Sequence, residues 1–192
     1  MTGIRPPIEA AESGGGIIPI MRALDFAARR HASQRRKGSL AEPYLNHLVE
    51  VACLLAEFTE GLDPELICAG ILHDIVEDTP TEFFELEDRF GAGVATLVRE
   101  LTDDKRLPKA LRKKMQVRSA PHKSPRARMI KIADKISNIR SVLDSPPAGW
   151  DLHRCRNYID WASRVVEGCR GVNQRLERSF DEVRQKAHAK LF

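Results

Sequence analysis

Cysteine is scarce in this chain of 192 residues, and the four that occur follow no metal-binding or disulfide pattern. No two of them have the CxxC spacing that is typical of zinc knuckles and redox motifs. Cys53, Cys68, Cys155 and Cys169 mostly have apolar neighbours, which is usual for reduced thiols in a protein core. The sequence therefore argues against a disulfide framework, and we expect a cytoplasmic protein.

Long apolar runs and a signal peptide are also missing. No stretch approaches the ~18 consecutive apolar residues that a membrane-spanning helix requires. Residues 1–15, which end in a run of glycines, are interpreted as a flexible leader. Residues 16–192 are long enough to bury one core, and we expect them to form a single domain that has no membrane partner.

Aromatic residues make up 6% of the chain, and no alternation typical of β-strands reaches a useful length. Ala, Leu, Glu, Arg and Lys are abundant instead, and these are the stronger helix formers. Apolar residues recur at intervals of three and four, as in amphipathic helices. We therefore predict an all-α domain of eight to ten helices. The expected helices cover about 17–36, 43–56, 64–78, 82–90, 94–101, 109–117, 126–143, 151–168 and 172–188.

The formal net charge of +4 is modest, but the basic residues are clustered. One cluster covers residues 29–37 and another covers residues 105–114, with further cations up to Arg128. Such clusters suit anionic ligands, whether phosphate esters, nucleic acid or a membrane surface. Most of these cations are interpreted as solvated helix faces.

In the stretch 71–79, at the end of one predicted helix, apolar residues surround four ionisable ones, His73, Asp74, Glu77 and Asp78. Positions four apart lie above one another on a helix, so His73 is expected under Glu77 and Asp74 under Asp78. Burying unpaired ions is costly, and a bound metal ion would offset most of that cost. We therefore expect a metal site at this stretch.

Two other predicted helices carry candidate ligands. Asp134 is followed on much the same face by Ser137 and Asn138, opposite an apolar stripe, and His47 lies on the helix before the His–Asp pair. Two imidazoles and two carboxylates form a mixed ligand set that suits Mn, Fe or Zn. Alone, Asp134 is also consistent with a surface ion pair to a neighbouring lysine. His31 is interpreted as a core residue.

The His–Asp pair with a distant aspartate resembles the signature of HD-domain metal-dependent phosphohydrolases. Further stretches are similar to the hydrolase domain of RelA/SpoT-type alarmone enzymes, and most of all to the small stand-alone hydrolases typified by the metazoan SpoT homologue. The chain departs from that family at Leu48, where proline is usual, and in the linker Gly38–Glu42. The matching stretches run in order across roughly residues 20–180: Asp25–Arg29, His31, Gln34–Lys37, Pro43–His47, Leu72–Asp74, Val76–Thr79, Phe90–Ala92, Thr102–Lys105, Leu107–Lys109, Ala133–Lys135, Asn138, His153–Arg154 and Tyr158.

The resemblance implies an all-α HD-domain bundle that hydrolyses the 3′-pyrophosphate of (p)ppGpp, giving GDP or GTP and pyrophosphate. It also implies one Mn²⁺ ion per chain, with another divalent transition metal as the alternative. The implied metal ligands are His47, His73, Asp74 and Asp134. Glu77 and Asp78, one turn further on, are expected to orient the attacking water or take its proton.

Seven more residues are implied to bind the substrate, because basic groups suit phosphates and aromatic rings suit a base. They are Arg36, Lys37, Tyr44, Lys109, Asn138, Arg154 and Tyr158. The expected partner is a small nucleotide and not a nucleic acid, and the sequence leaves a monomer or a homodimer open. No synthetase domain follows in this chain, so we expect a hydrolase only.

Two other interpretations compete with this one. The first keeps the chemistry and changes the substrate to the 2′-phosphate of NADPH or to another nucleotide, since these also place a ribose phosphate beside a base. The second is a non-catalytic helical module whose basic segment 105–128 binds nucleic acid with a strong salt dependence. The intact set of metal ligands favours a hydrolase.

Overall fold

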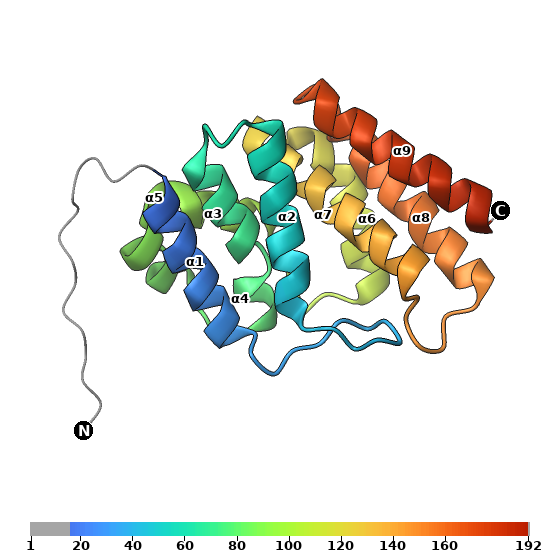
Figure 1. The fold of residues 1–192 in the computed structure, drawn as a ribbon, viewed down its shortest axis with the longest axis horizontal. Helices are drawn as coiled ribbons and strands as arrows, with labels where there is room; N and C mark the ends of the chain where they lie inside the picture. Colours follow the sequence, from blue (N-terminus) through green and yellow to red (C-terminus); the bar gives the residue numbers. More distant parts are fainter. Residues whose placement is uncertain (1–15, 192) are drawn as a thin grey trace.

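The structure is a computed structural model that describes residues 16–191, so the expected leader lies outside the described residues. Within that range the chain forms nine α-helices and one 3₁₀ turn, η1 (Ala120–His122), and its only β-pairing is two isolated bridges (Figure 1). The prediction of an all-α fold with eight to ten helices is confirmed. The helices are α1 (Ile17–Arg30), α2 (Tyr44–Phe58), α3 (Pro64–Leu72), α4 (Ile75–Asp78), α5 (Phe83–Leu101), α6 (Lys109–Ser119), α7 (Pro125–Asp144), α8 (Leu152–Glu167) and α9 (Gln174–Leu191).

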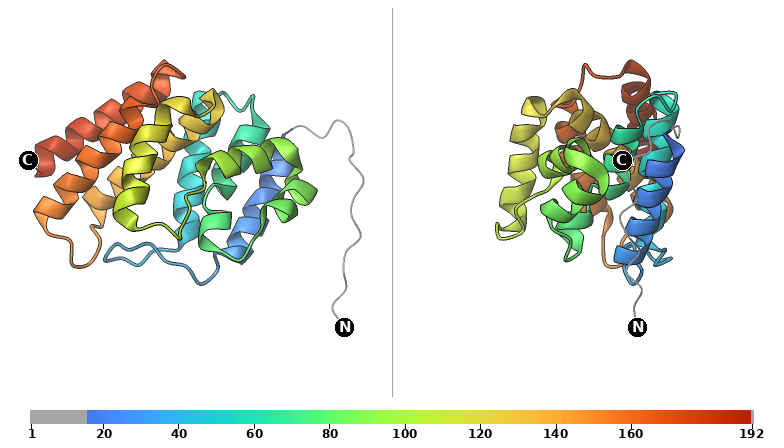
Figure 2. Two further views of the ribbon diagram at one scale, coloured as in Figure 1. Left: turned by 180° about the vertical axis from the view of Figure 1, so that it is seen from behind. Right: turned by 90° about the vertical axis from the view of Figure 1, so that its left-hand side faces the viewer.

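Helices α2 and α7 lie side by side in the middle of the molecule, with α1, α3 and α5 towards one end and α8 and α9 towards the other (Figure 1). Figure 2 shows α6 on the face opposite α2. Among residues 16–191, no helix combines the length and the apolar character that crossing a bilayer requires. The central pair α2 and α7 is therefore the frame on which the site is built.

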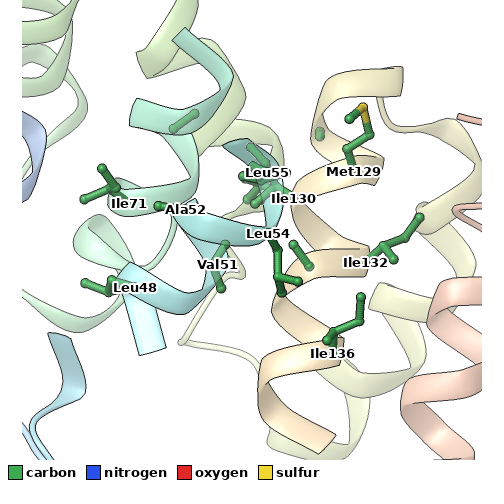
Figure 3. Close-up of a cluster of buried hydrophobic side chains, with 14 of the residues drawn as sticks. Leu48, Val51, Ala52, Leu54, Leu55, Ile71, Met129, Ile130, Ile132 and Ile136 are labelled. Carbon is green, nitrogen blue, oxygen red and sulfur yellow. The ribbon is translucent and has the colours of Figure 1, made fainter. Parts of the chain in front are cut away.

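The core between α2 and α7 is formed by aliphatic side chains at helical spacing (Figure 3). Leu55, Ile130 and Ile136 are fully buried there, and Leu48 is fully buried on the side of α2 that faces away from α7. Burial of each such side chain stabilises the fold by about 1.5–3 kcal/mol. Helix α3 approaches α2 closely because of Gly70, where a Cβ would lie 2.4 Å from the Leu55 Cδ1 atom. The missing side chain at residue 70 therefore leaves room for Leu55 of α2.

Several predicted helix boundaries are confirmed. Asp63 caps α3 by accepting a hydrogen bond from the Leu66 N–H, and Pro64 occupies its first turn, so the helix begins at residue 64, where its start was predicted. Gly91 interrupts α5 with a φ of 85°, which glycine adopts at little cost, so the predicted separation at this residue is present.

The first helix is shorter than predicted, since it ends at Arg30 and not near Arg36. The following loop pairs with itself, because the Arg36 N–H donates to the Glu42 carbonyl and the Tyr44 N–H donates to the Gln34 carbonyl. These bonds satisfy backbone groups that a longer helix would have used.

The four cysteines are free thiols, and Cys68, Cys155 and Cys169 are buried. The prediction of a core position is wrong for Cys53, which is exposed on α2. Its neighbours in sequence are apolar, but a helix turns successive side chains to different sides, so apolar neighbours do not imply burial.

Candidate metal centre and substrate cleft

Four side chains from three parts of the chain converge beside the contact between α2 and α7. His47 comes from α2, His73 and Asp74 from the turn between α3 and α4, and Asp134 from α7. The His47 Nε2 atom lies 3.4 Å from Asp134 Oδ1 and 3.8 Å from Asp74 Oδ2. The His73 Nε2 atom lies 3.0 Å from Asp74 Oδ2 and 3.8 Å from Asp134 Oδ1. The four expected metal ligands are therefore neighbours in space.

The continuous helix predicted through His73 and Asp74 is wrong, because α3 ends at Leu72 and α4 begins at Ile75. At Asp74 the backbone has φ −103° and ψ 0°, which departs from regular helical values and interrupts the helix between its two ionisable pairs. Asp78 keeps its relation to Asp74, since its N–H donates to the Asp74 carbonyl at 2.8 Å.

The donor set fits a divalent cation. The Nε2 atoms of His47 and His73 are buried and have no hydrogen-bond partner among the described residues. The His73 Nδ1 atom lies 2.7 Å from the Gly70 carbonyl oxygen, which can only accept, so Nδ1 carries a proton and, in the neutral imidazole that a metal ion binds, Nε2 presents a lone pair. The Nε2 atoms face the carboxylates of Asp74 and Asp134, which are acceptors when ionised. A centre made of lone pairs and negative charge suits a divalent metal ion.

The charges of the cluster reinforce this interpretation. Burial lowers the pKa of His47, which favours the neutral imidazole that a metal requires. Burial also acts to lower the pKa of His73, but interactions with Asp74 and Asp134 outweigh it and raise that pKa to about 10. Burial opposes ionisation of the two aspartates, yet their pKa values are held below the usual range, mainly by His73 for Asp74 and by Lys135 for Asp134. Without a metal ion, protonated His73 thus supplies the positive charge that stabilises the two ionised aspartates.

Both aspartates are oriented by neighbouring side chains. The Tyr44 hydroxyl donates to Asp74 Oδ2 at 2.5 Å. Asp134 accepts from Lys135 at 2.7 Å and from Asn138 at 2.5 Å, and Asp134 is 7% exposed. The polar face predicted for this helix is therefore an interior face, and the alternative of a surface ion pair for Asp134 is wrong.

Glu77 and Asp78 lie beside the metal ligands and line the same cleft. Glu77 Oε2 accepts from the Asp103 N–H at 3.3 Å, and Glu77 Oε1 lies 3.4 Å from Arg112 Nη1. Burial raises the pKa of Glu77, and the charges of Asp74 and Asp103 raise it further. A carboxylate with a raised pKa is a stronger proton acceptor, which suits the role expected from the sequence.

Asp78 is held from the α1 side of the cleft and from the loop after α5. Gln34 donates to Asp78 Oδ2 at 3.0 Å, and Lys105 donates to the other oxygen. Gln34 is hydrogen-bonded in turn to His31 at 2.6 Å, and the His31 ring packs on Tyr44 with 5.3 Å between ring centroids. His31 is buried, as expected of a core residue, but it also supports residues of the site.

A cleft of about 510 Å³ opens beside the cluster, and all seven residues expected to bind the substrate line it. Its cations crowd one another, since burial lowers the pKa of Lys109 and the charges of Lys37 and Arg154 lower it further. Its aromatic wall is formed by Trp150, Tyr158 and Trp161, with ring centroids 5.6 and 5.4 Å apart in that order. Cations and flat rings in one cleft suit a phosphorylated nucleotide.

Two of the residues expected to bind the substrate also form hydrogen bonds to other residues of the site. Tyr44 holds Asp74, as described above, and Asn138 joins Asp134 to the cleft by accepting a hydrogen bond from Arg36 at 3.1 Å. Asn138 therefore both lines the cleft and supports Asp134.

The lining residues that the sequence interpretation missed include two cations of α6, Arg112 and Lys113, and the two tryptophans, Trp150 and Trp161. Arg112 and Lys113 follow Lys109 by three and four positions, so helical spacing alone places them on one face with it. The tryptophans are the only two in the chain, which is a usable signal in so aromatic-poor a sequence. The interpretation of these cations as solvated surface is therefore wrong for the part of the basic cluster that lines the cleft.

Comparisons with known proteins agree with this geometry. A family profile described as HD domain matches residues 23–156. The human protein named guanosine-3′,5′-bis(diphosphate) 3′-pyrophosphohydrolase MESH1 is 46% identical over 170 residues, which cover 88% of this chain and 95% of the human protein. The protein of the same name from Drosophila melanogaster is 42% identical over 163 residues, covering 85% of this chain and 91% of that protein.

The fold is also similar to a solved structure described as "A metazoan ortholog of SpoT hydrolyzes ppGpp and plays a role in starvation responses". The TM-score is 0.85 at 40% sequence identity, and the match covers 92% of this chain and 97% of the other. The chain therefore belongs to the HD-domain family, in the group that contains the MESH1 proteins and the metazoan orthologue of SpoT.

Proposed function

We propose that this protein is a metal-dependent guanosine-3′,5′-bis(diphosphate) 3′-pyrophosphohydrolase, which converts (p)ppGpp to GDP or GTP and pyrophosphate. The observation that carries the proposal is the pair of buried imidazole nitrogens that have no hydrogen-bond partner within residues 16–191 and face two carboxylates beside a cationic and aromatic cleft. The similarity to MESH1 proteins, whose names state this activity, supports it. We assign the activity to residues 16–192 as one hydrolase domain.

His47, His73, Asp74 and Asp134 would hold the divalent ion, for which we propose Mn²⁺ because it accepts imidazole and carboxylate ligands together. Such an ion supplies Lewis acidity, which activates water and offsets negative charge on phosphate oxygens. We expect the enzyme to act in the cytoplasm, because its cysteines are free thiols and reducing compartments keep thiols in that state.

Glu77 accepts the proton of the attacking water, since it lies next to Asp74 and its pKa is raised. Asp78, fixed by Gln34 and Lys105, orients that water. The water oxygen attacks the phosphorus attached to the ribose 3′ oxygen. The bond from that phosphorus to the 3′ oxygen breaks, the 3′ oxygen takes up a proton, and pyrophosphate leaves with the oxygen of the water.

The remaining residues of the cleft bind the nucleotide. Arg36, Lys37, Lys109 and Arg154 pair with its phosphate groups, a task for which guanidinium and ammonium groups are well suited. The rings of Tyr44 and Tyr158 contact the nucleoside, with the phenol of Tyr158 kept neutral because burial raises its pKa to about 12. Asn138 links this set to the metal ligand Asp134.

One assay tests the substrate. The purified protein is incubated with ppGpp or with NADPH, in the presence of Mn²⁺ or of a chelator. We expect release of pyrophosphate from ppGpp that requires Mn²⁺. A preference for NADPH would be consistent with the proposed site but would show that the proposed substrate is wrong. Activity that survives chelation would show that the reaction does not depend on a metal ion.

A further inference from the structure

On the side away from the metal centre, His47 is hydrogen-bonded to a relay of three side chains, Ser137, Glu50 and Arg140. Its Nδ1 atom lies 2.8 Å from the Ser137 hydroxyl oxygen. The Ser137 hydroxyl donates to Glu50 Oε2 at 2.5 Å, and Arg140 donates to Glu50 Oε1 at 2.9 Å. Helix α2 supplies His47 and Glu50, three positions apart, and α7 supplies Ser137 and Arg140, also three apart, so the relay spans the contact between the two helices.

Counting protons gives this relay a direction. A serine hydroxyl has one proton, and an ionised glutamate can only accept, so Ser137 gives its proton to Glu50. Ser137 must then accept from His47, which places the imidazole proton on Nδ1. The opposite nitrogen, Nε2, is left as a bare lone pair that faces Asp134 and Asp74. His47 is 3% exposed and Ser137 is 1% exposed, so water does not compete for these positions.

The two histidines of the centre are thus held in different ways. His73 bonds to the Gly70 backbone carbonyl, which no substitution of another side chain removes. The bond of His47 depends entirely on side chains, and these reach a second cavity of about 200 Å³ lined by His47, Ser137, Glu50 and Arg140 among others. The outer end of the relay is partly open to solvent, since the side chains of Glu50 and Arg140 are 34% and 40% exposed.

We propose that Ser137 and Glu50 are positioning residues that fix the tautomer of His47 and aim its Nε2 lone pair at the cation site. This inference rests on the proposed function, because it takes His47 as a metal ligand. Side chains that orient a metal-binding histidine in this way typically contribute about 10–100-fold to metal affinity. Helices α2 and α7 would then each supply one metal ligand and, three residues further on, one residue of the relay.

The tautomer can be read directly in the metal-free protein by ¹⁵N NMR of labelled histidine, with His47→Gln used to assign the signals. We expect His47 to carry its proton on Nδ1 near neutral pH, and Ser137→Ala to lose this preference. Observation of the Nε2–H tautomer in the unsubstituted protein would overturn the proposal. This measurement does not depend on catalysis.

Calorimetric titration with Mn²⁺ provides the second test. Ser137→Ala and Glu50→Ala should weaken binding by about 10–100-fold, whereas Glu50→Gln should largely preserve it, because the amide oxygen still accepts from Ser137. The matched control is Ser163→Ala, which removes a half-buried serine whose hydroxyl bonds to the Ile159 carbonyl on α8. Circular dichroism and thermal melting identify any variant that fails to fold.

The proposed role of the relay is wrong if the folded Ser137→Ala and Glu50→Ala variants bind Mn²⁺ as tightly as the Ser163→Ala control. If the variants bind Mn²⁺ in the predicted order of affinity but the unsubstituted protein leaves ppGpp intact, the proposed substrate is wrong. The proposed role of the relay is then still supported. The two failures are therefore distinguishable.

Discussion

The hydroxyl of Tyr44 donates a hydrogen bond to Asp74 Oδ2 at 2.5 Å, so a residue of the substrate cleft also holds a metal ligand. Burial and the charge of Asp74 raise the pKa of Tyr44 well above its usual value, which keeps the phenol protonated and able to donate. The proposed substrate cleft and the proposed metal centre are therefore joined at this residue.

Tyr44→Phe should weaken Mn²⁺ binding by about 10-fold, because Asp74 loses the donor that orients it. Calorimetric titration measures the affinity. The matched control is Tyr158→Phe, which removes a second buried phenol of the cleft and should leave Mn²⁺ binding unchanged. The account of Tyr44 is wrong if both variants bind the ion equally well.

Glu77→Gln should keep Mn²⁺ binding and lower kcat by about 10²–10⁴-fold, because the amide cannot take a proton from water. Parallel titration and single-turnover kinetics separate the two effects. Loss of metal binding in this variant would show that Glu77 is a ligand and that its assigned role as a base is wrong.

The dependence of kcat on pH should report the raised pKa of Glu77. A base acts only when ionised, so the rate should rise with pH through the pKa of Glu77, at a midpoint above the ordinary value of 4.5. Asp103→Asn removes a negative charge that raises this pKa, so the acid limb should move to lower pH. Asp104→Asn is the control, since the exposed Asp104 pairs with Arg106. An unmoved limb in Asp103→Asn would contradict the assignment.

Lys109→Ala and Arg154→Ala should each raise the KM for ppGpp by about 10-fold or more, because a charge-assisted bond to phosphate is lost. Metal affinity should stay the same, as neither residue contacts the ligand cluster. Lys114→Ala, an exposed lysine of the same helix as Lys109 but outside the cleft, serves as the control. Equal KM values in all three variants would mean that these cations do not bind the substrate.

Most of the helices, and the charged stretch that holds His73 and Asp74, could be predicted from local signals. Apolar spacing of three and four located most of the helices, although α3 and α4 were expected as one helix and α5 as two. His73 and Asp74 stood out because charges are costly within an apolar stretch. These signals act within one or two helical turns, which is why they can be read from a sequence.

Other features depend on contacts between distant segments and could not be predicted in this way. The turn between Leu72 and Ile75 breaks the helix where the apolar periodicity of the sequence shows no interruption. The bond between Ser137 and Glu50 exists only because α7 packs on α2. Likewise, Arg112 belongs to the site because the fold brings α6 beside Glu77.

The central claim is that a metal ion held by the His–Asp cluster carries out the hydrolysis of ppGpp. The most direct test measures release of pyrophosphate from ppGpp in Mn²⁺ by the unsubstituted protein, by His73→Ala and by His122→Ala, which removes an exposed histidine outside the cleft. The account predicts that release is lost in His73→Ala and retained in His122→Ala. Undiminished release by a folded His73→Ala protein would contradict it.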